Sequence, residues 1–218
     1  MELNADFDTR VVVHSDQLEW NASPMVGVDR CMLNSILGEV ARATTIVRYA
    51  PKSKFSAHPH TSGEEFIVLD GVFQDEHGEF PEGTYVRNPM KTSHTPGSDK
   101  SCTIHVKLWQ FNMEDRNQFC KTMADELAES VNGLTTAELH RDAQEVVTYS
   151  QIATGSVLHK TDYGGIEIFV ISGSVIEGGD TLGKGAWLRL PDSRALSAVA
   201  GDDSGKYGHL AHVKPPTV

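Results

Sequence analysis

Hydrophobic residues occur along this chain in short, nearly continuous runs. The clearest runs are rich in Val, Ile, Phe and Thr, and they cover Thr44–Arg48, Phe66–Leu69, Ile104–Trp109 and Ile168–Ile171. Gly, Pro and Asp residues separate the runs, as in the turns that connect strands. Runs of this length are typical of strands that are buried on both faces. The pattern therefore predicts an all-β fold.

The pattern changes between residues 113 and 145. An apolar residue recurs there at every fourth position, at Phe119, Met123, Leu127 and Val131. This spacing predicts a helix with one apolar stripe, which Asn132-Gly133 would end. Thr135-x-x-Glu138 then has the form of a capping box that opens a second short helix. We expect a short helical connector over residues 113–145.

The chain also repeats itself at an offset of 102 residues. The matching pairs include Gly63/Gly165, Glu65/Glu167, Val68/Val170, Gly71/Gly173, Gly83/Gly185 and Pro89/Pro191. The match needs no gap from about 47/149 to 94/196, and a repeat of this length indicates a duplicated domain. The sequence thus predicts two tandem β-barrels, with domains at residues 1–112 and 146–218 on either side of the connector.

Composition and charge narrow the function classes. With 19 Lys and Arg against 30 Asp and Glu, the formal net charge is −11, which argues against a nucleic-acid partner. No apolar run reaches the length of a membrane span, and the acidic, polar N-terminus has no signal-peptide character. Three cysteines at unrelated spacings form neither a disulfide framework nor a CxxC site. A cytoplasmic location is expected.

The candidate chemistry lies in His58-Pro59-His60, followed by Glu64 and the distant His94. Side chains alternate along a strand, so His58 and His60 point to the same face. Three imidazoles and a carboxylate form a ligand set that suits a divalent transition metal. Glu65 competes with Glu64 as the carboxylate ligand. We favour Glu64, because the repeat retains a glutamate opposite Glu65, which suggests a structural role.

These residues resemble the paired motifs of the cupin superfamily, whose small jelly-roll barrels hold a metal on three histidines and one glutamate. The segments 63–71, 75–78, 83–89 and 94–96 resemble, more closely, the cupin domain of ChrR-type anti-sigma factors. The resemblance implies a metal site at His58, His60, Glu64 and His94. It favours zinc as the metal, with Fe, Mn and Ni as alternatives.

The second half of the repeat differs at these four positions. At the offset of 102, the ligands of the first half correspond to Lys160, Asp162, Ile166 and Leu196. Ile and Leu offer no ligand atom, so we expect a second barrel without metal. Lys160 and Asp162 could form an ion pair in its mouth. Tyr85 and Arg87, which share one face of their strand, are interpreted as structural wall residues of the first barrel.

Two functions follow from the resemblance. The first is a regulatory or sensing cupin related to anti-sigma factors; the HxxxCxxC cluster of their sigma-binding zinc domain does not occur here. The alternative is a mononuclear metal enzyme, such as an Fe(II) dioxygenase that acts on a small dicarbonyl-like substrate. The candidate partners are thus a small-molecule ligand and a sigma factor, and a homodimer is a further candidate. No catalytic residue beyond the metal ligands is assigned.

Overall fold

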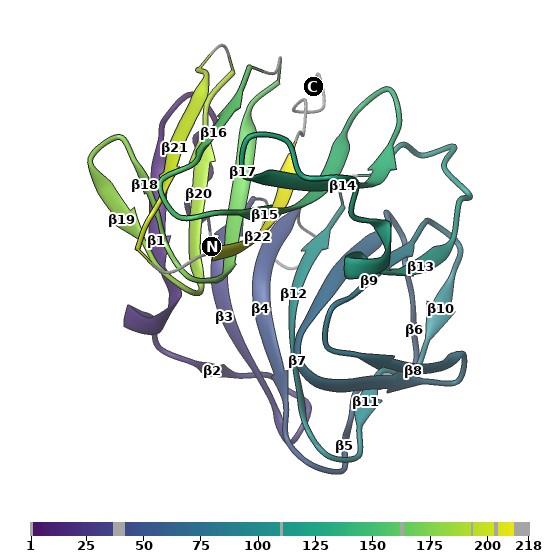
Figure 1. Cartoon of the computed structure of the whole chain (residues 1–218). Coiled ribbons are helices and arrows are strands. Elements are labelled where there is room, and N and C mark those ends of the chain that lie inside the picture. The colour runs from purple at the N-terminus through teal and green to yellow at the C-terminus, as the bar shows by residue number, and fades with distance from the viewer. Residues whose placement is uncertain are drawn as a thin grey trace. The chain divides into compact units, whose positions relative to one another are not determined.

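The computed structural model describes residues 2–36, 42–109, 111–161, 164–192, 194–202 and 205–211, the last range for its backbone (Figure 1). The chain divides into two compact units. Unit 1 comprises Met1–Ala5 and Leu18–Thr122, and unit 2 comprises Asp6–Gln17 and Met123–Val218. Within the described ranges, no helix has the length and apolar character of a membrane span. The predicted all-β class is confirmed, because strands paired in antiparallel form both units.

Unit 1 is built around one large antiparallel sheet. Its strands are β2 (Asn21–Ala22), β3 (Val28–Ser35), β4 (Ala43–Tyr49), β5 (Ser53–Lys54), β6 (His58–Pro59), β7 (Glu64–Asp75), β8 (Gly78–Pro81), β9 (Thr84–Asn88), β10 (Ser93–His94), β11 (Gly97–Ser98), β12 (Cys102–Leu108) and β13 (Phe119–Thr122). The sheet runs in the order β13-β9-β7-β12-β4-β3-β2, with β8, β11 and β5 attached to it. The short strands β6 and β10 form a separate pair.

Unit 2 contains two antiparallel sheets. Its elements are β1 (Val11–His14), the 3-10 turns η1 (Ser15–Gln17) and η2 (Met123–Glu126), β14 (Leu134–Arg141), β15 (Val146–Ile152), β16 (Val157–Lys160), β17 (Ile166–Ser172), β18 (Val175–Glu177), β19 (Asp180–Leu182), β20 (Ala186–Leu190), β21 (Leu196–Ala200) and β22 (Gly205–Ala211). One sheet has the order β1-β20-β17-β22-β15-β14 and the other β16-β21-β18-β19. The N-terminal strand β1 therefore pairs within unit 2.

Each unit has its own apolar core. In unit 1, Val47 of β4, Phe66 and Val68 of β7, and Ile104 and Val106 of β12 are buried together. These strands are neighbours in the sheet, and residues in register share a face, so the core forms a band across it. Unit 2 buries a corresponding group, including Ile166, Ile168, Leu188, Leu190 and Leu196. Burial of these side chains is the main stabilising term in both units.

The strand register repeats at the offset seen in the sequence. In unit 1, β7 pairs with β9 through Glu64↔Asn88, Glu65↔Arg87, Phe66↔Val86 and Ile67↔Tyr85. In unit 2, β17 pairs with β20 through Ile166↔Leu190, Glu167↔Arg189, Ile168↔Leu188 and Phe169↔Trp187. Every residue of the second set lies 102 positions after its counterpart. Gly71 and Gly173, at the same offset, both have positive φ, at 73° and 70°.

The predicted helical connector is wrong. Residues 119–122 form β13 and pair with β9, η2 is a single 3-10 turn, and residues 134–141 form β14 and pair with β15. Burial alternates over Ala137–Leu139 in β14, since Ala137 and Leu139 are buried and Glu138 is exposed. The apolar stripe does not form one face either, because Met123 is buried while Val131 is 66% exposed. Here pairing with available strand edges outweighs a weak helical preference.

We expect Gly71→Ala to lower the free energy of unfolding by about 3 kcal/mol, since a Cβ at this left-handed position would collide with the Ser101 carbonyl oxygen. Gly83→Ala is the matched control. Its φ is 84°, but no atom lies within 4 Å of the added methyl group, so the cost is about 1 kcal/mol of backbone strain. Urea unfolding monitored by circular dichroism measures both values. Equal losses would contradict the steric role assigned to Gly71.

Candidate metal centre

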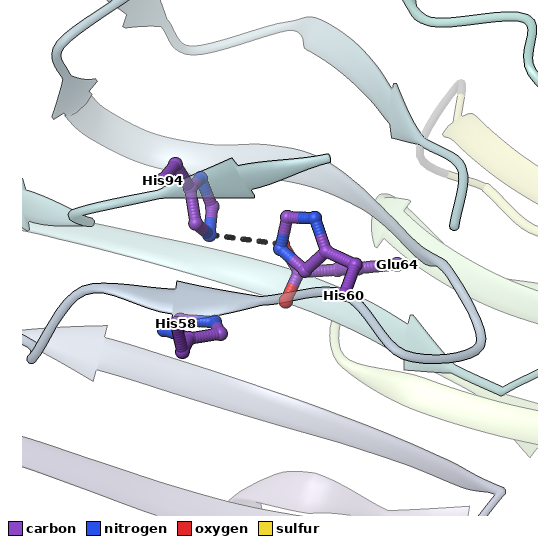
Figure 2. Close-up of side chains that lie close together, drawn as sticks. All are labelled: His58, His60, Glu64 and His94. Atoms are coloured by element: carbon purple, nitrogen blue, oxygen red, sulfur yellow. Dashed lines mark ion pairs between the residues drawn. The ribbon is translucent and has the colours of Figure 1, made fainter. Parts of the chain in front are cut away.

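The structure brings together all four residues selected from the sequence (Figure 2). His58 lies on β6, His60 directly follows this strand, Glu64 is the first residue of β7, and His94 is the last residue of β10. Strands β6 and β10 pair in antiparallel, with His94 opposite His58. One ligand atom from each side chain lies within 4.8 Å of the others. The short strands β6 and β10 and the first residue of β7 thus define the cluster.

Gly63 makes the close turn from His60 to Glu64 feasible. Its φ is 85°, a left-handed value that favours glycine, and an added Cβ would collide with the Phe111 ring. The Gly63 carbonyl also accepts a hydrogen bond from the backbone N–H of Trp109 at 3.1 Å. This packing fixes the start of β7, so Glu64 enters the cluster and not its neighbour Glu65.

Hydrogen bonds orient two of the histidines through their Nδ1 atoms. His58 Nδ1 lies 2.9 Å from the Ser56 carbonyl oxygen, which can only accept. His94 Nδ1 lies 3.1 Å from the Asp75 carboxylate. Both Nδ1 atoms therefore carry the proton in the neutral ring, which leaves the Nε2 lone pairs free. A second nitrogen that donates to a carbonyl or carboxylate is typical of histidines that bind metals.

His60 is oriented by a hydroxyl relay. Its Nδ1 lies 2.8 Å from Thr92 Oγ1, and that hydroxyl donates to the Pro89 carbonyl at 2.7 Å. A hydroxyl has one proton, so Thr92 must accept from His60 Nδ1. The Nε2 atom of His60 is then unprotonated, as in the other two rings. Three imidazole lone pairs and the Glu64 carboxylate thus belong to one cluster.

Without a cation, this arrangement leaves buried acceptors close to one another. The Nε2 atoms of His60 and His94 are buried and have no hydrogen-bond partner. Each of them lies 3.4 Å from Glu64 Oε1. Buried polar atoms are normally satisfied, and these atoms could all be satisfied by one shared ion. The donor set and its orphaned atoms fit a divalent transition metal.

The pKa shifts of Glu64, His58 and His94 are consistent with a site for a divalent metal. Burial alone would raise the pKa of the Glu64 carboxyl, but the contact with His60 and the positive charge of the three histidines in their protonated form lower it below its ordinary value. Burial lowers the pKa of His58, which favours the neutral ligand form. Burial opposes protonation of His94 too, yet its bond to Asp75 and the charge of Glu64 raise its pKa. The raised pKa reflects a negative field that also attracts a metal ion.

Glu65 lies on the opposite face of β7 and has other partners. Its Oε2 accepts a 2.6 Å hydrogen bond from the Tyr85 hydroxyl and lies 3.3 Å from Arg87 Nη1. Arg87 also contacts Asp115 at 2.9 Å and stacks on the Phe111 ring at 3.9 Å. All three side chains predicted to be structural, Glu65, Tyr85 and Arg87, are buried. Alternation along β7 separates this buried ion pair from the metal-ligand candidates.

The cluster borders a cavity of about 320 Å³ in unit 1. The cavity is lined by Arg30, Thr45, Val47, Tyr49, Phe55, His58, Pro59, His60, Thr61, Gly63, Glu64, Phe73, His94, Pro96, Ile104, Val106, Leu108 and Trp109. Sequence reasoning missed Asp75 and Thr92 as supports of the histidines, and Arg30 as a cavity residue. The alternation of β3 could have pointed to Arg30, but contacts between distant segments identify the two supports.

In unit 2, the corresponding positions hold different chemistry. Ile166 and Leu196 are buried in the apolar core, and Lys160 donates a 3.0 Å hydrogen bond to Thr148 Oγ1. Asp162 lies outside the described residues, and so does its predicted pairing with Lys160. Neither Ile166 nor Leu196 can supply a ligand atom. Among the described residues, the four-residue cluster of unit 1 is not repeated at the offset of 102.

Comparisons with known proteins agree with this fold. Residues 8–112 match the family model described as the ChrR cupin-like domain. A candidate dioxygenase from Nostoc punctiforme is similar in structure, with a TM-score of 0.76, 14% identity, and coverage of 97% of this chain and 85% of that one. Protein Ylba from E. coli has a TM-score of 0.75 and 15% identity over 98% of this chain and 94% of its own.

A further similar structure is the bacterial pirin YhhW of Escherichia coli, which was solved in complex with nickel(II). Its TM-score is 0.69 at 14% identity, and the match covers 94% of this chain and 99% of the pirin. No curated protein matches the chain. The family match and the structural similarity support one conclusion: residues 8–112 match a ChrR cupin-like domain, and the chain as a whole has a cupin fold.

Proposed function

We propose that the chain is a metal-dependent cupin whose unit 1 binds one divalent cation and a small molecule beside it. The observation that carries the proposal is the convergence of three unprotonated Nε2 atoms and the Glu64 carboxylate at a cavity of about 320 Å³. A purely structural ion would need no such cavity. This volume lies at the lower end of the range for small-ligand pockets.

His58, His60, Glu64 and His94 would hold the ion. When bound, a divalent ion supplies Lewis-acid chemistry toward oxygen atoms of a ligand, and Fe(II) supports oxygenation as well. The ligand set suits Zn, Fe, Mn and Ni alike. The nickel in the structurally similar pirin supports a divalent transition metal without selecting one. The chain's residues would contribute by fixing the imidazole orientations and by surrounding the ligand with an apolar wall.

We favour an enzymatic role, in which a small dicarbonyl-like substrate reacts with O₂ and both oxygen atoms enter the products. The cavity beside the metal ligands supports this role, as does the structural similarity to a candidate dioxygenase. The second candidate is a sensing role related to ChrR, which the family match over residues 8–112 favours. In that role zinc would stay bound, and a sigma factor would be the partner.

The repeated register leads us to propose a duplicated, two-barrel origin for the chain. The β7–β9 and β17–β20 pairs correspond residue by residue at the offset of 102. The hydrogen bonds Gly83 N–H to Val68 O and Gly185 N–H to Val170 O correspond at the same offset. On this proposal, unit 2 keeps the backbone geometry but has lost the metal. The domain limits, the cytoplasmic location and a homodimer remain predictions.

We expect the purified protein to bind one divalent metal ion per chain. His94→Ala should lose this ion, because the two remaining imidazoles and the Glu64 carboxylate make a much weaker site. His159→Ala is the matched control, since His159 is an exposed histidine of unit 2. Elemental analysis after loading with Zn²⁺ or Fe²⁺ and gel filtration measures the content. Two ions per chain, or full retention by His94→Ala, would contradict the proposed site.

Asp75 should control metal affinity without being a ligand. Asp75→Ala removes the carboxylate that holds His94 Nδ1, and we expect a loss of about 10- to 100-fold in affinity. Asp75→Asn, which retains an acceptor oxygen, should lose less. Glu82→Ala has the same change of charge at an exposed position and should keep wild-type affinity. Competition with a chelator measures the constants; an unchanged Asp75→Ala value would exclude the orienting role.

The two candidate functions differ in oxygen consumption. The Fe(II)-loaded protein should consume O₂ in proportion to an added member of a panel of small dicarbonyl compounds, and the His94→Ala protein should not. The zinc-loaded protein serves as the control for uncatalysed oxidation. A pull-down with sigma factors tests the sensing role, and we expect no binding. Stable zinc, no oxygen uptake with a panel of dicarbonyl compounds and capture of a sigma factor would together favour sensing over catalysis.

A further inference from the structure

Arg30 lies on the strand face that lines the cavity. The register across the sheet pairs Arg30 with Val47, Val47 with Ile104, and Ile104 with Val68. Residues opposite one another in an antiparallel sheet share a face, so Arg30 lies in this row between the apolar Val47 and the exposed Asn21. Val47, Ile104 and Arg30 all line the cavity that borders the metal-ligand candidates. A cation in this row is chemically unlike its neighbours.

The guanidinium of Arg30 has no carboxylate partner among the described residues. Its Nε is buried without a hydrogen bond, and its Cζ lies 5.5 Å from the centroid of the Phe55 ring. Two other strand arginines of unit 1 are paired, since Arg48 lies 2.9 Å from Asp29 and Arg87 lies 2.9 Å from Asp115. A buried donor without an acceptor is unfavourable, and a bound anion would satisfy it.

The charges around the cavity favour an anionic ligand. A divalent ion on three neutral imidazoles and the Glu64 carboxylate has a net charge of +1. The Asp75 carboxylate behind His94 cancels this charge, and Arg30 restores a net charge of +1. Tyr49 is neutral, because burial raises the pKa of its hydroxyl. The Thr45 hydroxyl already donates to the Cys31 carbonyl at 2.9 Å. The rest of the wall is largely apolar, so the ligand also needs an apolar body.

We propose that Arg30 is the anchor for the ligand of this cavity, and that the ligand is a small carboxylate with a second oxygen donor and an apolar body. The guanidinium fork matches a carboxylate in shape and charge. The second oxygen would face the metal ligands, and the apolar body would contact Val47, Ile104 and Val106. This inference rests on the proposed metal-dependent function and specifies the class of molecule that it uses.

The test compares 4-methyl-2-oxopentanoate with its methyl ester, which has the same body without the charge. Calorimetric titration of the zinc-loaded full chain should show that the acid binds about 10- to 100-fold more tightly than the ester. Arg30→Gln should remove this preference while the zinc content stays at one ion per chain. Arg30→Lys, which keeps the charge but not the fork, should restore part of it.

Arg48→Gln is the matched control, because Arg48 lies on the neighbouring strand and pairs with Asp29. It should leave the preference for the acid unchanged. The unfolding midpoint of Arg30→Gln should stay within a few degrees of wild type, since the replaced guanidinium has no protein carboxylate to lose. A large fall in the midpoint would indicate a structural role for Arg30 and overturn the assignment.

The outcomes separate this inference from the proposed function. Failure to load zinc would overturn the metal site. The same titrations on metal-free protein would still test Arg30. There we expect weaker binding of the acid, which Arg30→Gln should abolish. Loaded protein that binds acid and ester equally would overturn the anchor and leave the metal site intact. Loaded protein that does not bind the acid would overturn the ligand class.

Discussion

The antiparallel pairing of β6 with β10 is the constraint on which the candidate site depends, because it sets His94 opposite His58 across 36 positions of the chain. His60 then joins them through the alternation of the strand, and Gly63 turns the chain so that Glu64 enters the same place. The Nδ1 hydrogen bonds to Ser56, Thr92 and Asp75 fix the three rings with their lone pairs available. The cluster is thus pre-organised before any ion binds.

Alternation along β7 also separates two kinds of chemistry that share adjacent residues. Glu64 belongs to the metal-ligand cluster, whereas Glu65 is buried with Tyr85 and Arg87 on the other face. A one-residue slip of this strand would exchange the two carboxylates, so the register must be firmly set. A register slip would also separate Glu65 from Arg87. Each charge would then be buried without its partner, which is costly in the interior, so the pair disfavours the slip.

The two units show how a fold and a site diverge independently. Unit 2 has Glu167 opposite Arg189 where unit 1 has Glu65 opposite Arg87, so this structural position is retained. Arg189 also stacks on an aromatic ring, that of Phe7, at 4.2 Å. In contrast, the positions of Glu64 and His94 are occupied by Ile166 and Leu196, which extend the apolar core. Packing tolerates this exchange because the replaced residues faced the interior in both units.

The sequence by itself determined the all-β class, because strand alternation is a local property of the chain. Spacing brought His58, His60 and Glu64 together, whereas the distant His94 was added by the resemblance to the paired cupin motifs. The sequence also determined the offset of 102, at which the strand registers recur. Only the tertiary structure decided that residues 119–122 and 134–141 form strands instead of helices, since their partners are β9 and β15. It likewise decided the roles of Asp75, Thr92 and Arg30. Their contacts join segments that are distant in sequence, and such contacts depend on the pairing of strands and not on local residue preferences.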